Sequence, residues 1–73
     1  MNNLKLALTI EEASAYTGIG RNTIRQLIGW GKLPVLLVGR KIIIRRDALE
    51  SFILLNEGRN LKEKAEVRAP SGN

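Results

Sequence analysis

Apolar residues recur at helical spacing in the first half of the chain and predict two short helices joined by a tight turn. The first helix begins at Thr9, because Thr9 and Glu12 have the spacing of a capping box, in which each side chain binds the other residue's amide. Glu11 and Glu12 also place negative charge at the positive end of this helix. Gly18 is suited to end it as a left-handed cap residue.

The second helix is predicted over Arg21–Trp30, since Gly31 ends it and Pro34 prevents its continuation. Its inward-facing positions follow the i, i+3, i+4 spacing: Ile24, Leu27 and Ile28. At about 100° per residue, the opposite face carries polar and basic side chains instead. These are Arg21, Asn22, Arg25 and Gln26.

Two β-branched runs, Val35–Val38 and Ile42–Arg45, predict a β-hairpin in the second half of the chain. Two registers are open. A three-residue turn at Gly39–Lys41 pairs Val38 with Ile42 and leaves an apolar pair, Leu37 and Ile43, on the outer face.

The second register has a two-residue turn, Arg40-Lys41. It places three apolar side chains on the same face as Arg45: Leu36, Val38 and Ile43. Either register therefore leaves apolar side chains exposed on the hairpin, unless another part of the chain or a partner covers them.

A short strand is predicted at Lys5–Thr9, and a last helix follows the hairpin. Asp47 is its expected N-cap, with Glu50 in the capping-box position. The inward-facing residues are Leu49, Phe52 and Ile53. Together these elements predict an α+β fold over residues 1–58: a small winged helix-turn-helix domain with a β-hairpin wing, a short N-terminal strand and a C-terminal helix.

After Gly58 the chain becomes polar and mixed in charge. Its apolar side chains are too few to offset an ordering cost of roughly 1–2 kcal/mol per residue. Residues 59–73 are therefore predicted to be a flexible polar tail that matters for partner proteins more than for the fold.

Positive charge is concentrated in one part of the chain. The formal net charge is +5, yet residues 21–46 contain no acidic residue. The same stretch holds seven basic residues: Arg21, Arg25, Lys32, Arg40, Lys41, Arg45 and Arg46. A one-sided field of this kind favours a polyanionic partner, although a solvated basic surface is the simpler alternative.

The polar face of the second helix indicates what kind of polyanion this partner is. In a winged helix-turn-helix domain this helix lies in the major groove of double-stranded DNA. Asn22 and Gln26 each match the donor and acceptor on an adenine edge, and Arg25 matches guanine. Arg21 lies at the border of the same face. The alternative is an ordinary solvated helix face.

The wing supplies further candidate DNA contacts. Arg40 and Lys41 are expected at its tip, where they reach a minor groove or flanking phosphates. Arg45 and Arg46 precede the last helix and are candidate phosphate contacts, although placement on the surface explains them equally well.

The composition excludes several kinds of chemistry. With no cysteine and no histidine, a disulfide framework, a thiolate metal site and a histidine base are ruled out. We expect no catalytic residue, no metal and no cofactor, and hence no enzyme. The longest apolar runs are too short to span a bilayer and no secretory signal is visible, so a cytoplasmic protein without membrane contact is expected.

Residues 8–53, about three fifths of the chain, resemble the excisionase-type DNA-binding domains of phages and conjugative transposons. The resemblance rests on the segments LTIEEASAYTGIGRNTIRQLI, GKLP, VGRKIII and RRDALESFI. It implies a recombination directionality factor, which binds and bends DNA at the end of a mobile element and directs a tyrosine recombinase (integrase) towards excision.

Two other functions remain open from the sequence. A small transcriptional repressor uses the same domain shape. A protein-interaction module would use the outer apolar residues and the tail to dock a recombinase. Cooperative self-association on DNA is a further possibility that the sequence does not decide.

Overall fold

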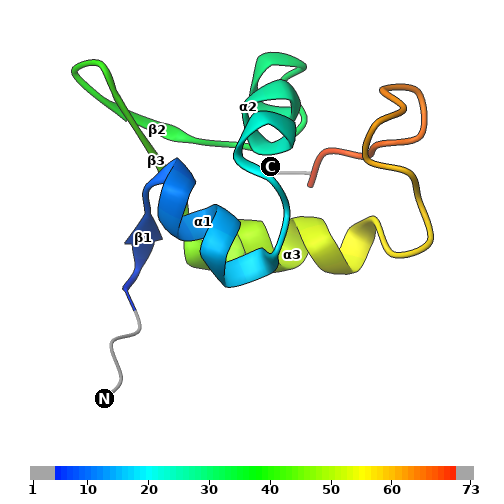
Figure 1. The fold of residues 1–73 in the computed structure, drawn as a ribbon, viewed down its shortest axis with the longest axis horizontal. Coiled ribbons are helices and arrows are strands. Elements are labelled where there is room, and N and C mark those ends of the chain that lie inside the picture. Colours follow the sequence, from blue (N-terminus) through cyan, green and yellow to red (C-terminus); the bar gives the residue numbers. More distant parts are fainter. Residues whose placement is uncertain (1–4, 71–73) are drawn as a thin grey trace.

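The computed structural model describes residues 5–70, which form three helices and a three-stranded antiparallel sheet (Figure 1). In chain order the elements are β1 (Ala7–Leu8), α1 (Ile10–Thr17), α2 (Arg21–Gly29), β2 (Leu36–Val38), β3 (Lys41–Arg45) and α3 (Arg46–Leu55). Strand β3 lies between β1 and β2, and the β2–β3 hairpin projects away from the helices. This arrangement confirms the predicted α+β fold with a helix-turn-helix and a wing.

Helix α1 begins and ends as the sequence predicts. The Oγ1 atom of Thr9 accepts a hydrogen bond from the Glu12 amide at 3.1 Å, and the Oε1 atom of Glu12 accepts one from the Thr9 amide at 3.0 Å. Gly18 ends the helix with a φ of 80°, in the left-handed region where glycine carries no side-chain penalty. The Lys5 ammonium and the Thr9 amide hold the pKa of the Glu12 carboxyl below its ordinary value. At pH values above the ordinary pKa of a glutamate, these contacts therefore stabilise the fold. The stabilisation is lost as the pH falls through the lowered pKa of Glu12.

Helix α2 packs through its apolar face, as predicted. Ile24 and Leu27 are buried, and Ile28 packs partly buried against the same core. Gly20 precedes the helix and supplies no side-chain cap, which costs only a few tenths of a kcal/mol relative to serine. The helix ends at Gly29, one residue before the predicted end.

The hairpin adopts neither of the two expected registers. Leu36 pairs with Ile43, Leu37 with Ile42, and Val38 with Lys41. The turn is therefore the two-residue Gly39-Arg40, and Gly39 has a φ of 63°. A two-residue hairpin turn needs positive φ at its first position, which glycine adopts without strain. That requirement places Gly39 in the turn and Lys41 in the strand.

The observed register still divides the side chains between faces as the second alternative predicts. It differs from that alternative by two residues, and a shift of two preserves the faces of a strand. Leu36, Val38 and Ile43 therefore share the face of Arg45. All three residues of β2 are exposed, with Leu37 at 70%. The prediction of exposed apolar side chains on the wing is confirmed.

Helix α3 starts two residues earlier than predicted, at Arg46, and the assignment of Asp47 as its N-cap is wrong. Strand β3 runs directly into the helix, so Arg45 is both its last residue and the N-cap. The Arg46 amide donates to the Leu6 carbonyl at 2.8 Å. This bond satisfies one of the first four amides of the helix, which have no partner within the helix. Leu49 and Phe52 are buried, as expected.

Residues 59–70, the C-terminal segment, fold back on the domain, which differs from the predicted flexible tail. Val67 is only 2% exposed and belongs to the core, and Leu61 packs partly buried against it. Because the segment is polar on average, its composition does not predict that this one side chain is buried. Residues 71–73, the rest of the predicted tail, lie outside the described residues.

A buried asparagine fixes the C-terminal segment in place. Asn56 is 5% exposed. Its Nδ2 atom donates to the carbonyls of Phe52 at 2.8 Å and Arg68 at 2.9 Å, and its Oδ1 atom accepts from the Arg68 amide at 2.8 Å. The Asn56 side chain thus binds both backbone groups of Arg68, and its buried polar atoms are satisfied.

One hydrophobic cluster joins α1, α2, α3, β1, β3 and the C-terminal segment. Its buried members are Leu8, Ala13, Ile24, Leu27, Leu33, Ile44, Leu49, Phe52 and Val67. None of the helices that the structure describes has the length and apolar character needed to cross a membrane.

Candidate nucleic-acid interface

Helix α2 presents its polar face to solvent. The four residues predicted to read DNA on this helix are all exposed: Arg21, Asn22, Arg25 and Gln26. Their orientation follows from the packing of Ile24 and Leu27 into the core on the other side. Gly29, also exposed, has open space around its Cα. This face of α2 is therefore open to solvent.

Two polar contacts organise the α2 face. The Arg25 Nη1 atom donates to the Asn22 Oδ1 atom at 3.4 Å, one turn along the helix. The Arg21 Nη1 atom donates to Glu11 Oε2 of helix α1 at 3.2 Å. Sequence reasoning did not predict this second contact, because Glu11 and Arg21 are ten residues apart and only the helix-turn-helix geometry joins them.

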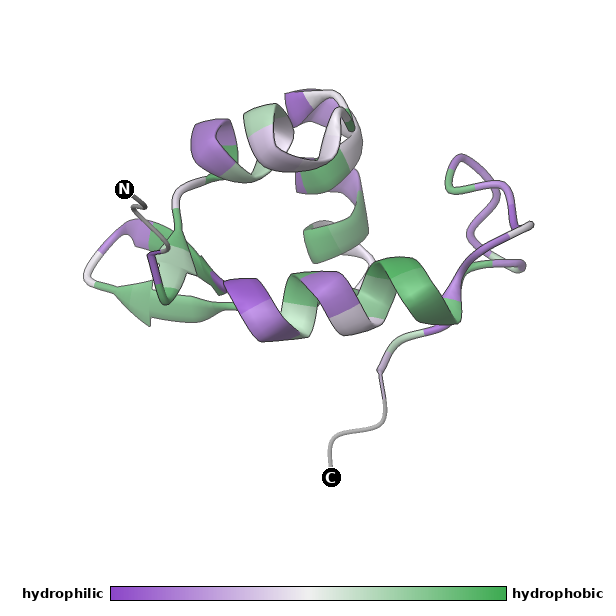
Figure 2. Ribbon diagram, turned by 90° about the horizontal axis from the view of Figure 1, so that it is seen from below, coloured by the Kyte–Doolittle hydropathy of each residue, from purple (hydrophilic) through white to green (hydrophobic). Residues whose placement is uncertain are grey.

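The tip of the wing lies beside the start of α1. Arg40 occupies the turn and Lys41 opens β3, and both are exposed. A hollow of about 370 Å³ separates the tip from the helix, lined by Thr9, Ile10, Glu11, Arg40, Lys41 and Ile42. Figure 2 shows the hydrophilic turn between the two hydrophobic strands. The wing tip and the start of α1 therefore border the same hollow, and the Glu11–Arg21 ion pair joins the start of α1 to the start of α2.

Arg45 and Arg46 do not share one environment. Arg45 is 56% exposed at its side chain and pairs with Asp47, whose Oδ1 atom lies 3.2 Å from the Arg45 Nε atom. Arg46 is only 27% exposed, and its Nε atom lies 3.9 Å from Glu50 Oε2. That Nε atom is buried without a hydrogen bond in the part of the chain that the structure describes. The structure therefore does not bring Arg46 to the exposed basic surface.

Glu50 joins α1 to α3 instead of capping α3. The Tyr16 hydroxyl donates to the Glu50 carboxylate. This hydrogen bond, together with partial burial, raises the pKa of the Tyr16 hydroxyl. The neighbouring Arg46 opposes the shift. The cluster of Tyr16, Glu50 and Arg46 thus ties α3 to α1.

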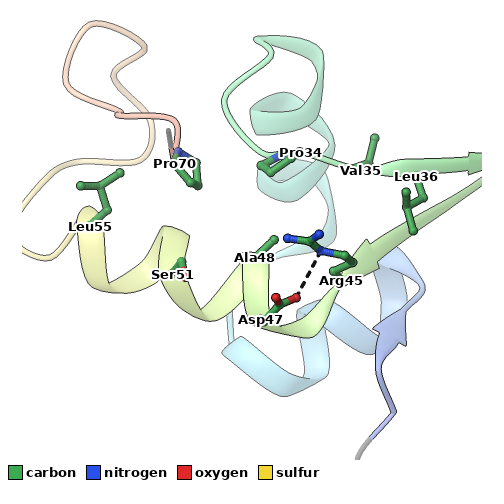
Figure 3. Close-up of a pocket in the computed structure, with 9 residues that line it drawn as sticks. All are labelled: Pro34, Val35, Leu36, Arg45, Asp47, Ala48, Ser51, Leu55 and Pro70. Carbon is green, nitrogen blue, oxygen red and sulfur yellow. Dashed lines mark ion pairs between the residues drawn. The ribbon is translucent and has the colours of Figure 1, made fainter. Parts of the chain in front are cut away.

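A second hollow, of about 510 Å³, lies between α3, the segment that enters β2 and Pro70 (Figure 3). Its lining is mostly apolar, and Figure 3 shows the ion pair of Arg45 and Asp47 beside it. Among residues 5–70 there is no cluster of three or more acidic side chains that could hold a metal ion.

Comparison with protein families gives one match. The pattern of the helix-turn-helix domain family matches residues 7–54, from β1 to the last turn of α3. Comparisons with curated proteins and with solved structures gave no match. The matched region includes α1, α2 and the wing, which carry the exposed polar and basic side chains described above, and the match supports DNA binding. Because it covers well over half of the 73 residues, the protein belongs to the helix-turn-helix domain family.

Proposed function

We propose that the protein is a DNA-binding excisionase, which binds and bends DNA at the end of a mobile element and directs a tyrosine recombinase towards excision. The observation that carries DNA binding is the exposed polar face of α2, within a helix-turn-helix domain that also has a basic wing tip. The recombination role rests on the resemblance of residues 8–53 to excisionase-type domains.

Base recognition is assigned to α2. Asn22 and Gln26 offer a donor and an acceptor that fit an adenine edge, and Arg25 offers two donors that fit guanine. The contact of Arg25 with Asn22 limits the positions that both side chains adopt before DNA is bound. Lower side-chain freedom in the unbound protein reduces the entropic cost of ordering them on DNA.

Backbone contacts are assigned to the wing and its flank. Arg40 and Lys41 reach a minor groove or the phosphates beside it, and Arg45 and Arg46 are proposed to contact phosphates. Arg46 must first leave its position between α1 and α3, because its side chain is mostly covered there. Arg45 is exposed, so exchanging the Asp47 carboxylate for a phosphate needs only a local change.

The excisionase role needs no catalytic group in this chain, because a recombinase performs the strand exchange. The chain's part is to bind DNA, to bend it and to contact the recombinase. The exposed apolar side chains of the wing and the apolar hollow beside α3 are available for such a protein contact. We also propose that copies of the protein associate cooperatively on DNA.

Duplex binding is expected to weaken steeply as the salt concentration rises. If roughly five to seven of the basic side chains in residues 21–46 meet phosphates, a plot of log Kobs against log salt has a slope of about −4 to −6. Fluorescence anisotropy with a labelled duplex, titrated from low to moderate salt, measures it. A slope near zero would contradict DNA binding altogether.

Substitutions in α2 and in the wing are expected to have different effects on DNA binding. Arg25→Ala and Gln26→Ala each remove base contacts, so each costs about 1–3 kcal/mol on the target and little on other sequences. Lys41→Ala removes a phosphate contact and weakens all sequences alike. Competition binding with target and mixed-sequence duplexes measures both effects. The opposite pattern would mean that the wing, and not α2, reads the bases.

The recombination role is tested by finding where the protein binds. Footprinting compares the ends of the host element with nearby promoters, and an excision assay with the element's recombinase measures the dependence on this protein. Protection at the ends together with dependent excision is expected. Protection at promoters alone, without an effect on excision, would identify a transcriptional repressor.

A further inference from the structure

An acidic side chain lies within the proposed DNA-binding surface. The Glu11 carboxylate pairs with Arg21, the first residue of α2, at 3.2 Å. Glu11 also lines the hollow that contains Arg40 and Lys41 of the wing. Figure 1 shows α1 starting beside the hairpin. Glu11 therefore lies between the helix that is proposed to read bases and the wing that is proposed to hold the backbone.

Helix capping does not explain this position. The capping box of α1 uses Glu12, whose carboxylate accepts the Thr9 amide. Glu11 is exposed and takes no part in that box. Its charge favours the positive end of the helix, but this benefit does not depend on a contact with α2. The pairing with Arg21 is thus an additional property of this side chain.

The charge of Glu11 acts on DNA of any sequence. A carboxylate in contact with Arg21 lies well within the screening length of about 8 Å at physiological salt. It cancels about one positive charge of the surface and repels phosphates. Sequence-independent binding depends almost entirely on phosphate contacts, so this kind of binding is weakened most.

The position of the Arg21 guanidinium matters at a target site. The side chains of Arg21 and Glu11 are 57% and 73% exposed, so the pair is solvated and easily exchanged. Pairing favours positions of the guanidinium near the N-terminal turn of α2, and within residues 5–70 Glu11 is its one ion-pair partner. A donor held in place loses less side-chain freedom when it meets a matching group.

We propose that Glu11 is a specificity-determining residue that acts through Arg21. It lowers the attraction of Arg21 for phosphates in general and holds Arg21 where a matching site can use it. Weakening the unwanted complexes is a recognised route to specificity, because specificity is a difference between affinities. This inference rests on the proposed DNA-binding function.

The test compares Glu11→Gln with Glu57→Gln in the full chain. Glu57 is exposed at the end of α3 that is remote from the hairpin, so both variants gain the same charge at different places. The probes are a labelled mixed-sequence duplex and the tightest duplex selected from a random pool, each titrated from about 50 to 200 mM salt. Circular dichroism melting checks that each variant is folded.

Glu11→Gln is expected to steepen the log–log salt slope for mixed-sequence DNA by about 1 and to tighten that binding about three- to tenfold at low salt. The selected duplex gains less, so the ratio of the two affinities falls. Glu57→Gln is expected to change neither the slope nor the ratio. In an Arg21→Gln background, Glu11→Gln is expected to have a smaller effect, because only the direct repulsion between the carboxylate and the phosphates is then removed.

Three results would overturn the inference while leaving DNA binding intact. The first is weaker binding of the selected duplex by Glu11→Gln alone, which would indicate that Glu11 contacts a base directly. The second is an equal gain in DNA affinity from Glu57→Gln. The third is an unchanged ratio between the affinities for the selected and the mixed-sequence duplex. Salt-independent or absent duplex binding by the unsubstituted chain would overturn the proposed function itself. The unsubstituted chain is measured first, so the two failures are distinguishable.

Discussion

Asn56→Ala is expected to lower the free energy of unfolding by about 1.5–4.5 kcal/mol, because three hydrogen bonds of a buried side chain are lost at about 0.5–1.5 kcal/mol each. The bonds join Asn56 to the Phe52 carbonyl and to both backbone groups of Arg68. In a domain of this size each kcal/mol shifts the melting temperature by about 4–8 °C. Thermal and urea unfolding followed by circular dichroism measure the loss.

The matched control is Asn60→Ala, the same substitution in the exposed part of the C-terminal segment. Within residues 5–70 the Asn60 side chain makes one hydrogen bond, which it accepts from the nearby Lys62 amide at 2.9 Å. A cost below about 1 kcal/mol is therefore expected. Equal losses from both variants would show that Asn56 does not hold the segment against the domain.

Val67→Ala is expected to cost about 2 kcal/mol. Two buried methyl groups are removed, and a cavity remains in a core that has few other side chains to fill it. Val67 is 2% exposed, whereas Val38 on the wing is 63% exposed. Val38→Ala is therefore the matched control, with an expected cost below about 1 kcal/mol. Chemical unfolding of the two variants under identical conditions gives the comparison.

The two losses are expected to be coupled. Asn56 and Val67 both attach the C-terminal segment to the domain, so the double variant should lose less stability than the two single variants predict together. Full additivity would mean that the segment is held by contacts other than these two. If Val67→Ala left the stability unchanged, residues 59–70 would not pack against the domain in solution. That result would agree with the prediction of a flexible tail.

The sequence determined the helix-turn-helix by local chemistry. The capping box of Thr9 and Glu12, the glycine at position 18 and the apolar spacing of Ile24 and Leu27 each act over four residues or fewer. Such signals do not depend on the rest of the fold, so they can be recognised without it. Because the buried face of α2 was identified correctly, its exposed polar face followed directly.

The register of the hairpin could not be predicted from local sequence patterns. Its β-branched runs identified two strands, but the register depended on whether Gly39 belongs to a strand or to the turn. The paired positions of the folded hairpin decide this, through the positive φ that a two-residue turn requires. In the same way, the start of α3 depended on the bond between the Arg46 amide and the Leu6 carbonyl, forty residues earlier in the chain.

Only the tertiary structure decided which isolated residues meet. Composition predicts a mobile tail after Gly58, because it averages Val67 with its polar neighbours, whereas the fold buries this one side chain and binds Arg68 to Asn56. Arg46 belongs to a basic run in the sequence, yet the fold directs it towards Glu50. Glu11 and Arg21 likewise come together only through the angle between α1 and α2. Sequence patterns record what a residue does within its own element, and contacts between elements depend on packing that no local pattern contains.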